Sequence, residues 1–442
     1  MSWSAKYIVL ILFTTVISYL AGILLDHAKN LNARKFILGF TLISCLGVLF
    51  VFKYFNFFSQ VIADTLNIFA IKLHPVTLNL LLPVGISFYT FQTLGYVIDV
   101  YRKNIAPEKN FIAYATFISF FPQLVAGPIE RTKNLLPQIK SVTELDFNHE
   151  RTTYGLKLMT WGFFKKLVVA DVLAKHADKI FNNVYDFEGF ALILAVLFFT
   201  IQIYCDFSGY SDIARGCANM LGIELMENFK SPYFSASIHE FWSRWHISLS
   251  TWFRDYLYIP LGGNRCSKVR HYFNLLVTFL ISGLWHGANL TFVIWGFVHG
   301  VAQVLEDMFT KSKKLDLKNN SHGLLWWLRV ICVFIFVSAA WTFFRANTLN
   351  DAMYIFKNCF NGIANLKNYL LSGIFKFGDK KQIAIIISLL AIYEYFSSKF
   401  DIIKSVTANK YVVVRYAVYF VMLTSILFFQ ATDEVAFVYF QF

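Results

Sequence analysis

The sequence is poor in charged residues. Only 15% of its 442 residues are Asp, Glu, Lys or Arg, whereas 57% are hydrophobic and 19% are aromatic. Soluble globular domains carry about a quarter charged residues, so this composition excludes an ordinary soluble domain and indicates a protein that resides in lipid. Proline and glycine are also scarce, with 8 and 22 residues, and the apolar segments therefore have few breaks.

Cysteine spacing motifs and the common catalytic motifs are lacking too. The six cysteines are scattered without any C-x-x-C spacing, which argues against a disulfide framework or a metal site. "HEFWS" has Ser243 where a zinc protease needs its second histidine, and "GYSDI" lacks the closing glycine of a nucleophile elbow. There is no P-loop and no dinucleotide fingerprint, so we expect no permanently bound cofactor.

Long apolar windows are abundant, and a membrane-spanning helix needs roughly 20 such residues. Eight windows are apolar or nearly so: Tyr7–Leu25, Phe36–Phe52, Phe190–Ile203, Phe273–Leu284, Leu290–Val304, Trp326–Phe344, Ile383–Ile392 and Tyr411–Phe429. Weaker windows lie around residues 78–98, 111–126 and 153–172. We predict an all-α polytopic membrane protein with about ten or eleven embedded helices, forming a single domain over residues 1–442.

The basic residues predict an orientation in the membrane. The net charge of +13 is dispersed among short loops, which suits anionic lipid headgroups better than nucleic acid. Basic clusters at residues 29–35, 265–270 and 311–318 should face the cytoplasm by the positive-inside rule. The amino terminus is then extracytoplasmic. The first window is long and lacks a clear small-x-small cleavage site, so we expect it to be a retained membrane helix.

Charged residues interrupt the apolar sequence near its middle. "DFSGYSDIARG" contains two aspartates and an arginine, which would cost on the order of 8–10 kcal/mol if they faced lipid. They should therefore face protein or a water-filled cavity. On a helix Asp212 lies one turn from both Ser208 and Arg215, and the pattern fits either an internal ion pair or direct substrate contact. Gly209 and Gly216 would let a neighbouring helix approach closely.

The stretch "SIHEFWSRWHISLSTWFRDYLYI" predicts one helix over residues 237–259, with Ser237 as its cap and "PLGG" as its stop. An aromatic stripe runs along it beside a polar line that includes His246. His246 is either satisfied by a neighbouring helix or part of a site. For Arg244 and Arg254 we favour the reading that they reach lipid headgroups or backbone carbonyls.

The stretch "FLISGLWHGANLTFVIWGFVHG" predicts a hairpin over residues 271–308 that breaks near Gly287. His286 is then the last residue of a helix. Irregular backbone at membrane depth must be buried in protein or line a cavity. His286 is therefore either a packing histidine or a site residue. His299 should pack. Burial keeps an imidazole neutral, and a neutral imidazole could take a proton from a hydroxyl that attacks an activated acyl group.

Several long motifs resemble those of the bacterial membrane-bound O-acyltransferases (MBOAT), above all the branch that serves alginate and peptidoglycan O-acetylation. The motifs are "FFPQLVAGPIER", "YCDFSGYSDIARG", "ENFKSPYFSASIHEFWSRWHISLSTWFRDYLYIPLGGNR" and "SGLWHGANLTFVIWG". The resemblance covers nearly the whole chain. It implies a ring of transmembrane helices around a central tunnel.

The resemblance also implies a function and its residues. Acetyl-CoA would enter from the cytoplasm, and the acetyl group would reach hydroxyls of an extracytoplasmic polysaccharide, usually through a secreted or membrane-anchored SGNH-type acetyltransferase partner. The protein would lie in the bacterial inner membrane. His286 of "WHG" would be the catalytic base, and His246 of "RWHISLS" its companion in the tunnel. Further candidates for substrate binding or the tunnel are Asp206, Ser208, Asp212, Arg244 and Asp255.

Two points stay open at this stage. Aspartate and arginine inside a membrane also suit a pathway, so the alternative function is a transporter or flippase of an acylated or anionic envelope precursor. Members of the resembling family commonly carry membrane helices ahead of the segment that matches "SAKYIVLILFTT". Either this lineage lacks them or the sequence starts inside the family pattern.

Overall fold

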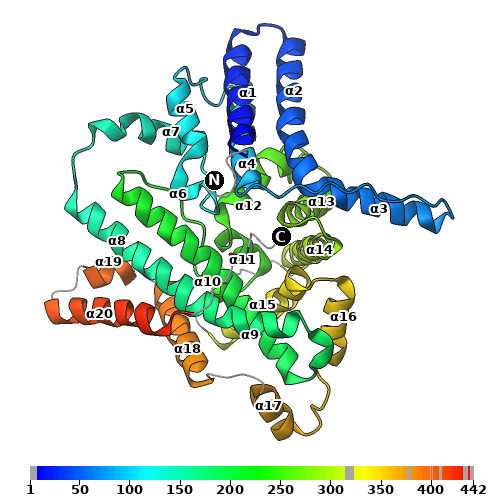
Figure 1. Cartoon of the computed structure of the whole chain (residues 1–442), viewed down its shortest axis with the longest axis vertical. Coiled ribbons are helices and arrows are strands. Elements are labelled where there is room, and N and C mark those ends of the chain that lie inside the picture. Colours follow the sequence, from blue (N-terminus) through cyan, green and yellow to red (C-terminus); the bar gives the residue numbers. More distant parts are fainter. Residues whose placement is uncertain are drawn as a thin grey trace. The chain divides into compact units, whose positions relative to one another are not determined.

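The computed structural model describes residues 7–313, 323–375, 380–398, 400, 402–407, 411–431 and 437–438, and in this part every regular element is a helix (Figure 1). Six described helices are long and apolar enough to cross a membrane: Ile8–His27, Leu31–Ile68, Phe190–Met220, Leu290–Phe309, Leu324–Arg345 and Val412–Phe429. Each of the six overlaps a predicted window. The all-α polytopic membrane fold is therefore confirmed, and the count of ten or eleven embedded helices stays a prediction.

The chain falls into two compact units, of which the first comprises Met1–His149, Ala218–Met226 and Gly287–Asn289. Its helices are α1 (Ile8–His27), α2 (Leu31–Leu49), α3 (Phe55–Ile68), α4 (Ile86–Tyr101), α5 (Phe111–Ser119), α6 (Phe121–Leu124) and α7 (Thr132–Ser141), with a π-helical turn η2 (Phe50–Tyr54) between α2 and α3. Helices α1 and α2 lie side by side (Figure 1). The weak window around residues 78–98 is helical only from Ile86, because Gly85 (φ 78°) precedes the helix in the left-handed conformation.

The second unit comprises Glu150–Cys217, Glu227–His286 and Leu290–Phe442. Its first helices are α8 (His149–Phe163), η4 (Phe164–Ala170), α9 (Asp171–Phe181), α10 (Phe190–Met220), α11 (Ile238–Arg244), α12 (Ile247–Phe253) and η7 (Arg254–Tyr258). They are followed by α13 (Lys268–His286), α14 (Leu290–Lys313), α15 (Leu324–Arg345), α16 (Leu349–Asn358), α17 (Leu366–Phe375), α18 (Lys380–Ser397), α19 (Ile402–Thr407) and α20 (Val412–Phe429).

Close packing of α8 against α10 depends on glycine, as predicted. A methyl group added at Gly209 would lie 2.8 Å from the carbonyl oxygen of Gly162, and one added at Gly216 would lie 2.5 Å from that of Gly155. Real Cβ atoms do not approach so closely, so only glycine lets the two backbones meet here. This contact holds the polar half of α10 against α8.

The prediction of a single helix over residues 237–259 is wrong. Helix α11 ends at Arg244, and His246 takes the left-handed conformation (φ 43°, ψ 53°) before α12 begins at Ile247. Ser237 does cap α11, because its hydroxyl accepts a hydrogen bond from the backbone N–H of Glu240 at 3.0 Å. The sequence pattern missed the break because its apolar stripe continues on both sides of it.

The predicted hairpin is present. Helix α13 ends at His286 and α14 begins at Leu290, on either side of the predicted break. A methyl group at Gly283 would collide with the carbonyl oxygen of Phe292, and one at Gly296 would collide with that of Phe279. Paired glycines thus bring α13 and α14 into direct contact and fix the direction of the helix that carries His286.

Candidate active site

His246 and His286 lie together in the second unit. Their ring centroids are 6.4 Å apart and their planes are inclined by 60°. The residues are 0% and 4% exposed. The two histidines that the sequence singled out therefore share one buried place, each at a helix end where the backbone leaves regular structure.

Aromatic rings surround this pair. Ring centroids of Trp295 and Phe344 lie 5.1 and 5.3 Å from that of His286, and the ring of Phe207 lies 4.5 Å from that of His246. Neither ring nitrogen of His246 has a hydrogen-bond partner in the part of the chain that the structure describes. His246 belongs to none of the six candidate spans, and burial lowers its pKa to about 3. Its imidazole is therefore neutral at physiological pH, the form that a proton acceptor requires.

His299 packs, as predicted. It is fully buried, and its Nδ1 accepts a hydrogen bond from Nε1–H of Trp242 at 3.3 Å. A buried tryptophan N–H needs such a partner, which accounts for a histidine at this position without any chemistry.

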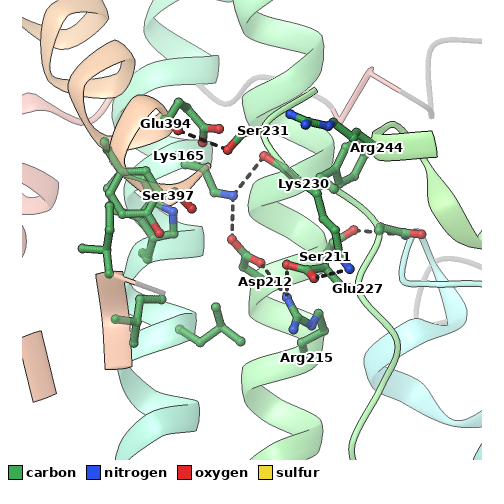
Figure 2. Close-up of a pocket in the computed structure, with 18 of the residues that line it drawn as sticks. Lys165, Ser211, Asp212, Arg215, Glu227, Lys230, Ser231, Arg244, Glu394 and Ser397 are labelled. Atoms are coloured by element: carbon green, nitrogen blue, oxygen red, sulfur yellow. Dashed lines mark hydrogen bonds and ion pairs between the residues drawn. The ribbon is translucent and has the colours of Figure 1, made fainter. Parts of the chain in front are cut away.

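A polar cavity of about 600 Å³ lies in the same unit (Figure 2). Helices α8, α10, α11, α18 and α19, the π-helical turn η4 and the segment after α10 line it. Its charged and polar residues include Lys165, Ser208, Ser211, Asp212, Arg215, Glu227, Asn228, Lys230, Ser231, Ser243, Arg244 and Glu394. Three of the predicted candidates, Ser208, Asp212 and Arg244, thus line one cavity.

The charges of the cavity are paired with one another (Figure 2). The ammonium group of Lys165 lies 2.5 Å from a carboxylate oxygen of Asp212 and donates to the hydroxyl of Ser208 at 3.0 Å. Arg215 lies 3.6 Å from Asp212, which is the ion pair that the sequence pattern left open beside substrate contact, and 3.7 Å from Glu227. These pairs neutralise most of the buried charge while their polar atoms still face the cavity.

Asp206 occupies a different place from the cavity. One of its carboxylate oxygens lies 2.7 Å from the ammonium group of Lys166, and the other accepts a hydrogen bond from the backbone N–H of Val438 at 2.7 Å. Lys166 also pairs with Asp171 at 2.7 Å. The protein itself engages both oxygens of Asp206, so these contacts tie the described C-terminal segment to α10.

The remaining two charged candidates, Arg244 and Asp255, differ in position, because only Arg244 lines the cavity. Arg244 lines the cavity and pairs with Glu240 at 2.5 Å, one turn earlier on α11. Asp255 lies in η7, where it accepts from Nε–H of Arg254 at 2.8 Å, and it does not line the cavity. Arg254 is the more exposed arginine, with 59% of its side chain accessible against 29% for Arg244.

Sequence reasoning missed Lys165 and Glu394. Lys165 is 3% exposed and Glu394 is 8% exposed, and both line the cavity beside Tyr204. The sequence carried a signal in both places, because "FFKKLVV" puts two lysines inside a weak apolar window and Glu394 lies two residues after another window. Charges in such windows mark sites or pathways. Their meeting across more than two hundred residues had no local signal.

One aromatic layer separates the cavity from the histidines. Phe229 lines the cavity, and its ring centroid lies 5.0 Å from that of Phe207 and 6.5 Å from that of His246. Neither His246 nor His286 lines this cavity. The geometry thus offers a polar chamber beside a buried pair of imidazoles.

Comparison with known proteins adds the family context. A family model described as MBOAT, membrane-bound O-acyltransferase family, matches residues 103–340. The probable alginate O-acetylase AlgI of Pseudomonas aeruginosa is 41% identical over 367 residues, covering 81% of this chain and 67% of that protein. The peptidoglycan O-acetyltransferase of Helicobacter pylori is 36% identical, covering 82% and 72%. The teichoic acid D-alanyltransferase of Streptococcus thermophilus is 28% identical, covering 61% and 70%.

Proposed function

This chain belongs to the membrane-bound O-acyltransferase family, as its motifs predicted, and from that premise we propose that it transfers an acetyl group from cytosolic acetyl-CoA to hydroxyls of an extracytoplasmic polysaccharide. The names of its relatives, an alginate O-acetylase and a peptidoglycan O-acetyltransferase, support an acceptor of that class. The buried pair of His246 and His286 is the observation that carries the proposal.

In the proposed reaction His286 is the base. It takes the proton of the acceptor hydroxyl while the oxygen attacks the thioester carbonyl of acetyl-CoA. The tetrahedral intermediate then expels the CoA sulfur, which receives the proton back, so that His286 is neutral again. A positioned general base typically contributes about 10²–10⁴-fold to such a step. His246, whose ring centroid is 6.4 Å from that of His286, is the proposed companion of this base in the tunnel.

The polar cavity is the proposed entrance for the donor. Its volume of about 600 Å³ falls in the range of small-molecule sites, which is about 300–1,000 Å³. Lys230 and Arg244 are its more accessible cations, with 61% and 29% of their side chains exposed, and such groups suit the phosphates of CoA. Ser208 and Asp212 line the inner wall and belong to the proposed substrate path. Asp206 and Asp255 remain candidates from their motifs alone.

A partner completes the proposal. The acetyl group would pass to the polysaccharide through a secreted or membrane-anchored SGNH-type acetyltransferase, with this chain in the bacterial inner membrane and its amino terminus outside the cytoplasm. The family match favours this enzyme over the transporter or flippase that the intramembrane charges also suggested.

The proposal can be tested in membranes of producing cells, which retain the natural partners. Acetyl-CoA is added to inverted vesicles that contain alginate or peptidoglycan oligosaccharides, and free CoA is measured with a thiol reagent. We expect CoA release that depends on this chain and on the acceptor, together with acetyl esters on the oligosaccharide. Loss of acetyl-CoA into the vesicles without CoA release, for either acceptor, would favour transport instead.

A further inference from the structure

The break between α11 and α12 leaves backbone groups without helical partners, and one short segment supplies the missing partners. The carbonyl oxygen of Arg244 accepts from the backbone N–H of Lys230 at 2.9 Å. The backbone N–H of Ile247 donates to the carbonyl oxygen of Asn228 at 3.0 Å. Buried backbone groups that a helix leaves unpaired must be satisfied elsewhere in the protein, and residues 228–230 do this here.

Asn228 adds its side chain to this arrangement. Its Oδ1 accepts from the backbone N–H of Ser248 at 3.2 Å, which is the role of an N-cap performed by a residue from outside the helix. Its Nδ2 donates to the hydroxyl of Ser211 on α10 at 3.3 Å. Asn228 is 1% exposed, so these hydrogen bonds are buried within the protein. One side chain thus joins the start of α12 to the helix that carries Asp212.

In the sequence, His246 lies between the Arg244 carbonyl, which is bonded to Lys230, and the Ile247 N–H, which is bonded to Asn228. It is one of four described non-glycine residues with positive φ, a conformation that persists only where the surroundings enforce it. On a continuous helix His246 would follow Ser243, which lines the polar cavity. Because of the left-handed turn, His246 does not continue the helix face that lines the cavity, and its ring lies beside those of His286 and Phe207.

We infer that Asn228 is a positioning residue for acyl transfer: by capping α12 and anchoring to Ser211, it enforces the left-handed turn that presents the His246 ring to His286. The inference rests on the proposed function of the histidine pair. It also makes Asn228 the physical link between the wall of the donor cavity, which it lines, and the imidazoles beyond Phe229.

A double-mutant cycle tests this inference. Asn228→Leu removes both side-chain bonds, and we expect transfer to fall by about 10- to 100-fold, the scale of a misplaced catalytic group. In a His246→Ala background the same change should add less than about twofold, because its effect runs through His246. Asn228→Asp keeps an acceptor at the start of α12, and the Ser211 hydroxyl can donate to its second oxygen, so it should lower transfer less than Asn228→Leu does. Asn274→Leu, another fully buried asparagine that bonds a loop carbonyl, is the matched control and should lower stability without lowering transfer.

Hydrogen exchange provides a readout that does not depend on activity. Asn228→Leu, and the milder Ser211→Ala if the first variant does not fold, should speed backbone exchange at Ile247 and Ser248 while α13 and α14 stay protected. Unchanged exchange there, or equal losses of transfer with and without His246, would overturn the inference. If His246→Ala alone transfers acetyl groups normally, the proposed role of His246 fails, and that outcome is distinct from a failure at Asn228.

Discussion

The imidazole rings of His246 and His286 lie 6.4 Å apart although forty residues separate them in the sequence. Each sits where a helix stops: His246 at a left-handed turn between α11 and α12, and His286 at the end of α13. Aromatic side chains surround both, so the pair is held in a place with few polar neighbours. Burial lowers the pKa of His246, so its imidazole stays neutral, the form that can accept a proton.

Replacing His286 tests the proposed base. We expect His286→Ala to insert and fold but to lower acetyl transfer by at least about 10²-fold, the lower bound for a lost general base. Acetyl esters formed on oligosaccharide acceptors, normalised to protein in the membrane, measure the effect. His239→Ala, an exposed histidine on α11, is the control and should transfer normally. Transfer by His286→Ala within tenfold of the unchanged protein would contradict the assignment.

Arg244 and Arg254 form a matched pair for the donor site, because only Arg244 lines the cavity. A hydrogen bond to a charged group contributes about 1.5–3 kcal/mol, so Arg244→Gln should raise the KM for acetyl-CoA by roughly tenfold or more. Arg254→Gln should leave it unchanged. Initial rates of CoA release across a range of acetyl-CoA concentrations give both values. Equal effects of the two substitutions would argue against the cavity as the donor entrance.

The Lys166 cluster should be structural. Lys166→Met leaves the buried carboxylates of Asp171 and Asp206 without their cation, and breaking a buried pair in this way costs about 3–5 kcal/mol. Asp206→Asn should cost less, because its amide oxygen can still accept from Val438 and Lys166 keeps Asp171. Thermal unfolding in detergent ranks the two variants. A larger loss for Asp206→Asn would show that this account of the cluster is wrong.

The glycines of α10 should be intolerant of a methyl group. Gly209→Ala and Gly216→Ala each force α8 and α10 apart, which should cost about 1–3 kcal/mol as overpacking does. Gly47→Ala on α2 meets nothing within 4 Å and should be neutral or gain about 0.5–1 kcal/mol from better helix propensity. Midpoints of thermal unfolding compare the three variants. Similar midpoints for all of them would contradict the close helix contact.

Buried His246 should make the protein sensitive to acid. Its pKa falls from 6.5 to about 3 on folding, so below pH 6.5 the unfolded chain binds a proton that the folded chain does not. Above pH 6.5 both the folded and the unfolded chain carry a neutral His246, and its titration costs no stability. At pH 5 protonation of the unfolded chain lowers the free energy of unfolding by about 2 kcal/mol. His246→Asn tolerates the left-handed turn and should flatten the pH dependence between pH 6.5 and 4. Parallel stability curves for the two proteins would show that the imidazole is not buried as described.

Much of the architecture could be predicted from the sequence because it follows from local composition. Six apolar windows overlap candidate spans, and the first helix of the hairpin ends at His286, next to the predicted break at Gly287. The glycines of "DFSGYSDIARG" identified a close helix contact. Each of these features depends on which residues follow one another, and the transfer of apolar side chains out of water decides the result.

The site itself was decided by the tertiary structure. Lys165 meets Asp212 from another helix, and Glu394 comes from a distant part of the chain to line the same cavity. Away from the cavity, Lys166 meets Asp206. The sequence alone determined that charges and imidazoles would be buried in an apolar chain, since lipid offers them no partners. The tertiary structure decides which partner each of these groups meets. It also decides the break between α11 and α12 at His246, which depends on hydrogen bonds from distant residues such as Asn228. Those bonds exist only once the helices have packed.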